Sequence, residues 1–116
     1  QKEQQMMSHI APTSDIQAIT FALELFPSLE LEGDNEIQAN INYQLCLSAG
    51  RKIIHHEPNI SANEFRVVFC ALQAVQLINS NDLDVEIDSD IKKQCNTYFF
   101  TVNKLVAALE PFLPKQ

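Results

Sequence analysis

The amino-acid sequence predicts an all-α fold, arranged as a four-helix bundle or as two stacked helical hairpins. Three observations support this prediction. The 116 residues include only two glycines, which leaves few positions for the tight turns of a β-rich fold. Apolar residues recur every three or four positions in four segments, the spacing of one helix face. Prolines and capping residues separate these segments.

The length and the charge of the chain limit what it can be. A chain of 116 residues corresponds to one domain, and its apolar content of 46% is sufficient for a core. The formal net charge of −7 opposes binding to nucleic acid or to an anionic membrane surface. No apolar run approaches the roughly 20 residues of a membrane span. We therefore expect neither nucleic acid nor a membrane as a partner.

The first two helices are predicted over residues 15–26 and 35–56. Ser14 is placed to cap the first helix, and Pro27 is expected to end it. Gly50 lies inside the second helix and costs it about 1 kcal/mol relative to alanine, so a kink or an early end there stays open. The apolar residues of the second helix fall at steps of four: Ile37, Ile41, Leu45, Ala49 and Ile53.

The third helix has the clearest start signal in the chain. Residues 59–65 read NISANEF, which places Ser61 at the N-cap and Glu64 three positions later, the pattern of a capping box. Ile60 and Phe65 flank this pair as a hydrophobic staple. From there to Ile78 the segment is apolar on nearly all sides, which predicts a helix in the middle of the bundle.

The fourth helix is predicted over residues 89–110. Its consecutive aromatic residues spread around the helix, because successive side chains point about 100° apart. Tyr98 and Phe99 are expected to face the core, whereas Phe100 falls on the polar side with Asn103. An exposed aromatic is a typical interface anchor; a scattered surface position, or burial under the N-terminal residues, is an equal alternative. The apolar seam of this helix is Ile91, Cys95, Tyr98, Val102, Leu105 and Leu109.

The chain is predicted to consist of a flexible N-terminal segment, residues 1–13, and a single helical domain, residues 14–116. The domain shows a trace of internal doubling. Residues 29–37 read LELEGDNEI and residues 83–91 read LDVEIDSDI, and each stretch precedes a long helix. This doubling would divide the domain into two helix–connector–helix units, 14–58 and 61–111.

The acidic stretch NSNDLDVEIDSD, residues 79–90, has three interpretations. It does not fit an EF-hand, because a frame that starts at Asp82 puts Ile87 where Gly is needed and Lys93 where Glu is needed. Its alternation is also the period of a strand, which would make residues 83–87 pair with 29–32 as a minimal two-strand ribbon. The interpretation we favour is an extended connector that leaves its acidic side chains in water.

Part of this acidic charge has a structural explanation. Asp88 and Asp90 precede or begin the fourth helix, where the helix dipole favours anions. No such explanation applies to Asp82, Asp84 and Glu86. These three residues are therefore candidates for an acidic surface that binds a basic partner.

The stretch RKIIHHEP, residues 51–58, invites a metal or catalytic interpretation. His55 and His56 are adjacent and point about 100° apart, which disfavours a shared ion. The three cysteines, Cys46, Cys70 and Cys95, are odd in number and have no short spacing, which favours a reducing, cytoplasmic compartment. No cofactor is expected. A metal- or thiol-dependent site that uses His55 or His56 with a cysteine stays as an alternative.

Together these observations favour a non-enzymatic protein–protein interaction module, such as a small acidic regulator, adaptor or inhibitor. Such a module binds a protein partner or associates with itself. The predicted contact residues are Phe100, Asp82, Asp84 and Glu86. Because the chain begins with Gln1 rather than Met, a helical domain of a larger protein is a further alternative.

Overall fold

The structure, a computed structural model, describes residues 14–30, 36–57, 59–82 and 87–113. These residues form five α-helices and one 3₁₀ turn, and they contain no β-strand, which confirms the predicted all-α class. The predicted N-terminal segment 1–13 lies outside the described residues. The elements are α2 (Ser14–Glu30), α3 (Glu36–Ile54), α4 (Ala62–Asn79), α5 (Ser89–Thr97), α6 (Phe99–Leu109) and η2 (Glu110–Phe112).

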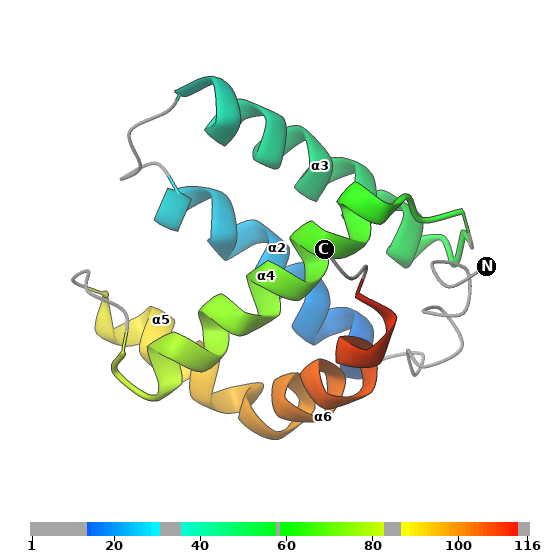
Figure 1. Ribbon diagram of the computed structural model, residues 1–116. Coiled ribbons are helices and arrows are strands. Elements are labelled where there is room, and N and C mark those ends of the chain that lie inside the picture. Colours follow the sequence, from blue (N-terminus) through cyan, green and yellow to red (C-terminus); the bar gives the residue numbers. More distant parts are fainter. Residues whose placement is uncertain (1–13, 31–35, 58, 83–86, 114–116) are drawn as a thin grey trace.

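Helix α4 is the centre of the fold (Figure 1). It contacts α2, α3, α5 and α6, with α3 on one side of it and α5 and α6 on the other. This position agrees with the prediction from its nearly continuous apolar surface. None of the helices in the described part of the chain is both long and apolar enough to cross a membrane. The largest fully buried apolar side chains include Ile19, Ile53, Phe65, Val68, Leu72, Val75, Val102, Leu105 and Leu109.

Helix α2 continues past the proline that was expected to end it. It runs from Ser14 to Glu30 with Pro27 inside. A proline removes one backbone hydrogen bond but does not prevent another turn when side chains support it. Here the Ser28 hydroxyl donates to the Leu25 carbonyl at 2.7 Å, and Leu29 packs against the core. The predicted end at residue 26 is therefore wrong.

The same continuation corrects the predicted ribbon. Leu29 and Glu30 belong to the last turn of α2 and not to a strand. Residues 31–32 and 83–86, which were to form the rest of the ribbon, lie outside the described residues.

Helix α3 runs without interruption through Gly50 to Ile54, so the early end that the sequence left open there does not occur. Its predicted apolar face is buried only in the second half. Ala49 and Ile53 are buried, but Ile37 is 75% exposed and Ile41 is also exposed. The physical reason is that α4 crosses α3 at an angle and contacts it through Ser48 and Lys52, beyond the first half of the helix (Figure 1).

The start of α4 matches its prediction. The Glu64 backbone N–H donates to the Ser61 hydroxyl at 3.1 Å, and the Ser61 backbone N–H donates to the Glu64 carboxylate at 2.8 Å. These two bonds form the predicted capping box. Ile60 and Phe65 are both buried, as the hydrophobic staple requires.

The single helix predicted over residues 89–110 is divided at Tyr98 into α5 and α6. Tyr98 has φ −98° and ψ 9°, and its ring lies 5.1 Å from the ring of Phe21 in α2. The predicted seam nevertheless faces the core, since Cys95 on α5 and Val102, Leu105 and Leu109 on α6 are all buried. The prediction of one helix is wrong, and the prediction of its apolar seam is confirmed.

Two helices end with a non-glycine residue in the left-handed region. His56 follows α3 with φ 54°, and Asn81 follows α4 with φ 59°. The Glu57 N–H donates to the Lys52 carbonyl at 2.8 Å, and the Asp82 N–H donates to the Leu77 carbonyl at 2.9 Å. Both arrangements are Schellman motifs, in which glycine is the preferred residue at the left-handed position.

We expect His56→Gly to stabilise the protein by roughly 0.5–1 kcal/mol. The left-handed conformation costs an ordinary residue about 1–2 kcal/mol, and the greater flexibility of glycine in the unfolded chain offsets part of the gain. The measurement is the midpoint of urea unfolding. His55→Gly is the matched control, because the His55 N–H bonds to the Arg51 carbonyl at 3.1 Å in the last helical turn. That variant should lower the midpoint, and a lower midpoint for His56→Gly would contradict the prediction.

Candidate functional site

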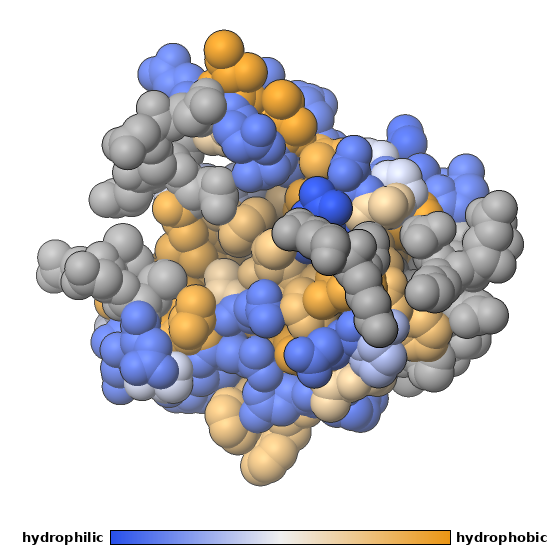
Figure 2. Space-filling view, viewed as in Figure 1, coloured by the Kyte–Doolittle hydropathy of each residue, from blue (hydrophilic) through white to orange (hydrophobic). Residues whose placement is uncertain are grey.

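Helix α3 carries most of the exposed apolar surface of the molecule. Of the eight large apolar side chains that are exposed in the described part of the chain, five belong to α3. Figure 2 shows apolar residues gathered over this helix at the top of the view. The side chains are Ile37, Ile41, Tyr43, Leu47 and Ile54. Apolar side chains concentrated on one helix indicate a contact surface more strongly than the same number scattered over the molecule.

Three of these side chains share one side of α3. Tyr43, Leu47 and Ile54 are separated by four and seven residues, which places them above one another along the helix. Gly50 lies between Leu47 and Ile54 on the same side. We call this row, Tyr43, Leu47, Gly50 and Ile54, the α3 stripe.

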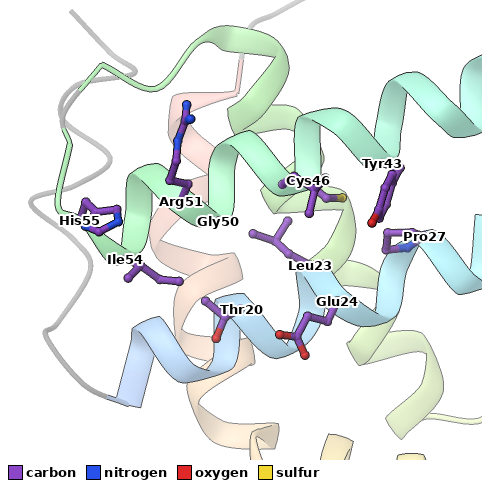
Figure 3. A pocket seen from close by; sticks show the side chains of 11 residues that line it. Thr20, Leu23, Glu24, Pro27, Tyr43, Cys46, Gly50, Arg51, Ile54 and His55 are labelled. Atoms are coloured by element: carbon purple, nitrogen blue, oxygen red, sulfur yellow. The ribbon is translucent and has the colours of Figure 1, made fainter.

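The α3 stripe forms one wall of a groove between α2 and α3 (Figure 3). The groove has a volume of about 580 Å³, and its floor includes Leu23 and Cys46. The opposite wall comes from Thr20, Glu24 and Pro27 of α2. Gly50 lies beside α2, where a Cβ atom would make an ordinary van der Waals contact with Leu23 Cδ1 at 3.7 Å. Lacking a side chain, Gly50 also keeps the middle of the groove open.

A second hollow continues the groove toward the start of α3. It has a volume of about 590 Å³ and shares Glu24, Pro27 and Tyr43 with the first. Glu36 and Asn40 line its far end. The two hollows together extend along α3 from its first turn to its end.

The groove is apolar inside and charged at its edges. Glu24 lies on the α2 edge, and Arg51 and His55 lie on the α3 edge (Figure 3). All three side chains are exposed. Apolar interiors with a few polar groups at the rim are typical of ligand and partner-binding surfaces.

The wall formed by α3 is held in place by a buried carboxylate. Glu64 of α4 is 3% exposed, and it accepts hydrogen bonds from Lys52 Nζ at 2.8 Å and from the Ser48 hydroxyl. Lys52 Nζ also donates to the Asn59 carbonyl at 3.1 Å. Burial alone would raise the pKa of Glu64, but the hydrogen bonds from Lys52, Ser48 and Ser61 outweigh it and lower the pKa to about 2. The carboxylate therefore stays charged and fixes α3 to the start of α4.

Phe100, the predicted interface anchor, is 84% exposed and is the most exposed large apolar side chain in the described residues. Its ring packs edge-on against Phe99 at a centroid distance of 5.3 Å. Phe99 is itself exposed, so the expectation that it faces the core is wrong, whereas Tyr98 is partly buried. Phe99 and Phe100 form a second apolar surface at the start of α6, separate from the groove.

The structure gives Asp82 a local role. The Ser80 hydroxyl donates to its carboxylate at 2.8 Å, and its backbone N–H completes the Schellman motif of α4. The prediction that Asp82 has no structural role is therefore wrong, although its side chain remains exposed. Asp84 and Glu86, the other two acidic candidates, lie outside the described residues.

The histidines and cysteines of the described residues do not form a compact metal site. His55 and Cys46 both line the groove, but nine residues of helix separate them, which corresponds to about 13 Å along the axis. His56 is exposed and occupies the left-handed position after α3. Burial raises the pKa of Cys95 to about 11, which disfavours the reactive thiolate. The described residues contain no group of three or more metal-ligating side chains.

Comparison with protein-family models, with curated proteins and with solved structures found no match to this chain.

The groove residues were not among the sequence-predicted contacts, yet the sequence contains a signal for them. Helix α3 has two apolar rows, one through Leu45, Ala49 and Ile53 and another through Tyr43, Leu47 and Ile54. A helix at the edge of a small bundle buries only one such row. The second row therefore marks a surface left for another contact, and only the contribution of α2 required the structure.

Proposed function

We propose that this protein is a non-enzymatic protein–protein interaction module that binds its partner through the α2–α3 groove. The observation that carries the proposal is the α3 stripe, which lies exposed beside an apolar groove. Leaving these side chains in water gives up roughly 25 cal/mol for each Å² that a partner would cover. A helix is the element that such a groove accommodates best, because its width matches the space between two packed helices.

The charged rim supports recognition of a protein over binding of a small molecule. Glu24, Arg51 and His55 stand at the edges of the groove and not inside it. Rim charges steer association and fix the orientation of a partner more than they add affinity. Phe100 is a second contact point, supported by its exposure alone.

Site-specific photo-crosslinking in cells tests this function. A photoreactive amino acid replaces Leu47 in one variant and Gln73 in another; both positions are exposed on helices, and Gln73 lies on the opposite side of α4 from Glu64. We expect covalent protein adducts at position 47 and none at position 73. Equal labelling at both positions, or no adduct at position 47, would contradict the proposal.

A further inference from the structure

We infer that the α2–α3 groove receives α3 of a second copy of this chain, so that the protein forms a two-fold dimer. This inference rests on the proposed function and identifies the partner. It is carried by the match between the groove and the helix that borders it.

The first part of the match is shape. The groove needs an apolar helix with room for close approach at its centre, and the α3 stripe provides this. Leu47 and Gly50 lie in the middle of the stripe, with Tyr43 and Ile54 at its ends. When two stripes meet around a two-fold axis parallel to the helices, Leu47 packs against Leu47 of the other copy, and Gly50 lies opposite Gly50, where the missing side chains let the two helices approach closely. Interfaces between identical copies are self-complementary in this sense.

The geometry of a two-fold axis decides the direction of the helices. If the two-fold axis runs parallel to the helices, α3 of each copy can lie in the groove of the other copy. The two α2 helices then lie on opposite sides of the pair of α3 helices. An axis perpendicular to the helices would instead drive the two α2 helices into each other if α3 entered the groove fully. We therefore place the two α3 helices parallel and in register, so that each residue of one α3 lies at the same height as the identical residue of the other.

The second part of the match is charge. Leu23 lies at the level of Gly50, so Glu24 lies within one helical turn of the level of Arg51. Arg51 is four residues from Leu47, on the outer side of the stripe, which is the side that faces α2 of the other copy. The dimer thus brings each Arg51 to the Glu24 of its partner, twice by symmetry. Within one copy, the structure records no ion pair for either residue among its described residues.

Charge reversal tests the pairing in a way that a foreign partner cannot imitate. Glu24→Arg alone gives two repulsive contacts per dimer, and Arg51→Glu alone does the same. An equimolar mixture of these two variants restores both attractive contacts in the mixed dimer. The measurement is molar mass by light scattering during size-exclusion chromatography, at physiological salt, where the Debye length of about 8 Å screens the long-range repulsion between two acidic copies.

We expect the wild type to reach twice the 13.1 kDa of one chain as its concentration rises. Each single variant should have a dissociation constant at least about tenfold higher, and the mixture should return to the wild-type value. Leu47→Asp should abolish the dimer, and Lys93→Glu, a charge reversal on the exposed side of α5, should leave it unchanged. Glu24 and Arg51 are both exposed, so their substitution should not disturb the fold. Circular dichroism of each variant checks that the fold is retained.

Several results would overturn the inference. A wild type that stays at the mass of one chain would do so, as would a mixture that associates no better than its two components. A dimer that depends on Phe100 and not on Leu47 would place the interface on α6. An adduct at position 47 with a different protein and none with a second copy would support the proposed function while rejecting the dimer.

Discussion

Replacing Glu64 with alanine is expected to lower the free energy of unfolding by about 3–5 kcal/mol, the largest single effect that we predict. The substitution removes the carboxylate that accepts from Lys52 and Ser48 and leaves a partly buried ammonium group behind. It also removes half of the capping box at the start of α4. A small domain has roughly 5–15 kcal/mol of stability in total, so this loss threatens folding itself.

The measurement is urea unfolding followed by circular dichroism at neutral pH. Glu57→Ala is the matched control, since Glu57 is exposed and lies near the same turn. Its effect should stay within about 0.5 kcal/mol. Equal effects of the two substitutions would show that the buried pair contributes nothing to stability.

The same carboxylate predicts how stability depends on pH. Its pKa of about 2 in the folded state is below the ordinary value of 4.5, so the unfolded chain binds the proton more tightly. Stability from this group is therefore fully present above about pH 4.5 and is lost as the pH falls toward 2, with a total of about 3 kcal/mol. Glu64→Gln should lack this component, which a comparison of melting temperatures across that range would reveal.

Replacing Lys104 with methionine is expected to cost about 2–3 kcal/mol, the second largest effect. Lys104 Nζ lies 2.8 Å from Asp15 Oδ1 and ties α6 to the first turn of α2. The Asp15 side chain is 1% exposed and the Lys104 side chain is 59% exposed. Removing the lysine therefore takes the ammonium group away from a buried carboxylate, whereas removing the aspartate only returns a lysine to water.

A double-mutant cycle measures this asymmetry. The three proteins are Asp15→Asn, Lys104→Met and the double variant, each unfolded in urea at neutral pH. We expect the double variant to be more stable than Lys104→Met alone, because the buried charge is gone. Additive losses would mean that the two side chains do not interact.

Of the features that form the candidate site, the sequence predicts those set by neighbouring residues and not those set by contacts between distant segments. The capping box at Ser61 and Glu64 was predicted because capping depends only on residues three positions apart. The roles of Ser48 and Lys52 were not predicted, since they bond to Glu64 from a helix that is 12 to 16 residues away in sequence. The groove likewise combines a part that the sequence pattern predicts with a part that only helix packing sets. Its α3 wall is visible as a second apolar row, but its α2 wall depends on how two helices pack.

The sequence by itself determined the helical class, the start of α4, the central place of that helix and the apolar seam near the end of the chain. Each of these follows from spacing along the chain, which neighbouring residues set through local geometry. The tertiary structure alone decided the extension of α2 past Pro27, the bend at Tyr98, and which apolar rows are covered. These features depend on what packs against a segment, because contacts such as Leu29 with the core or Tyr98 with Phe21 outweigh the local preference for ending or continuing a helix.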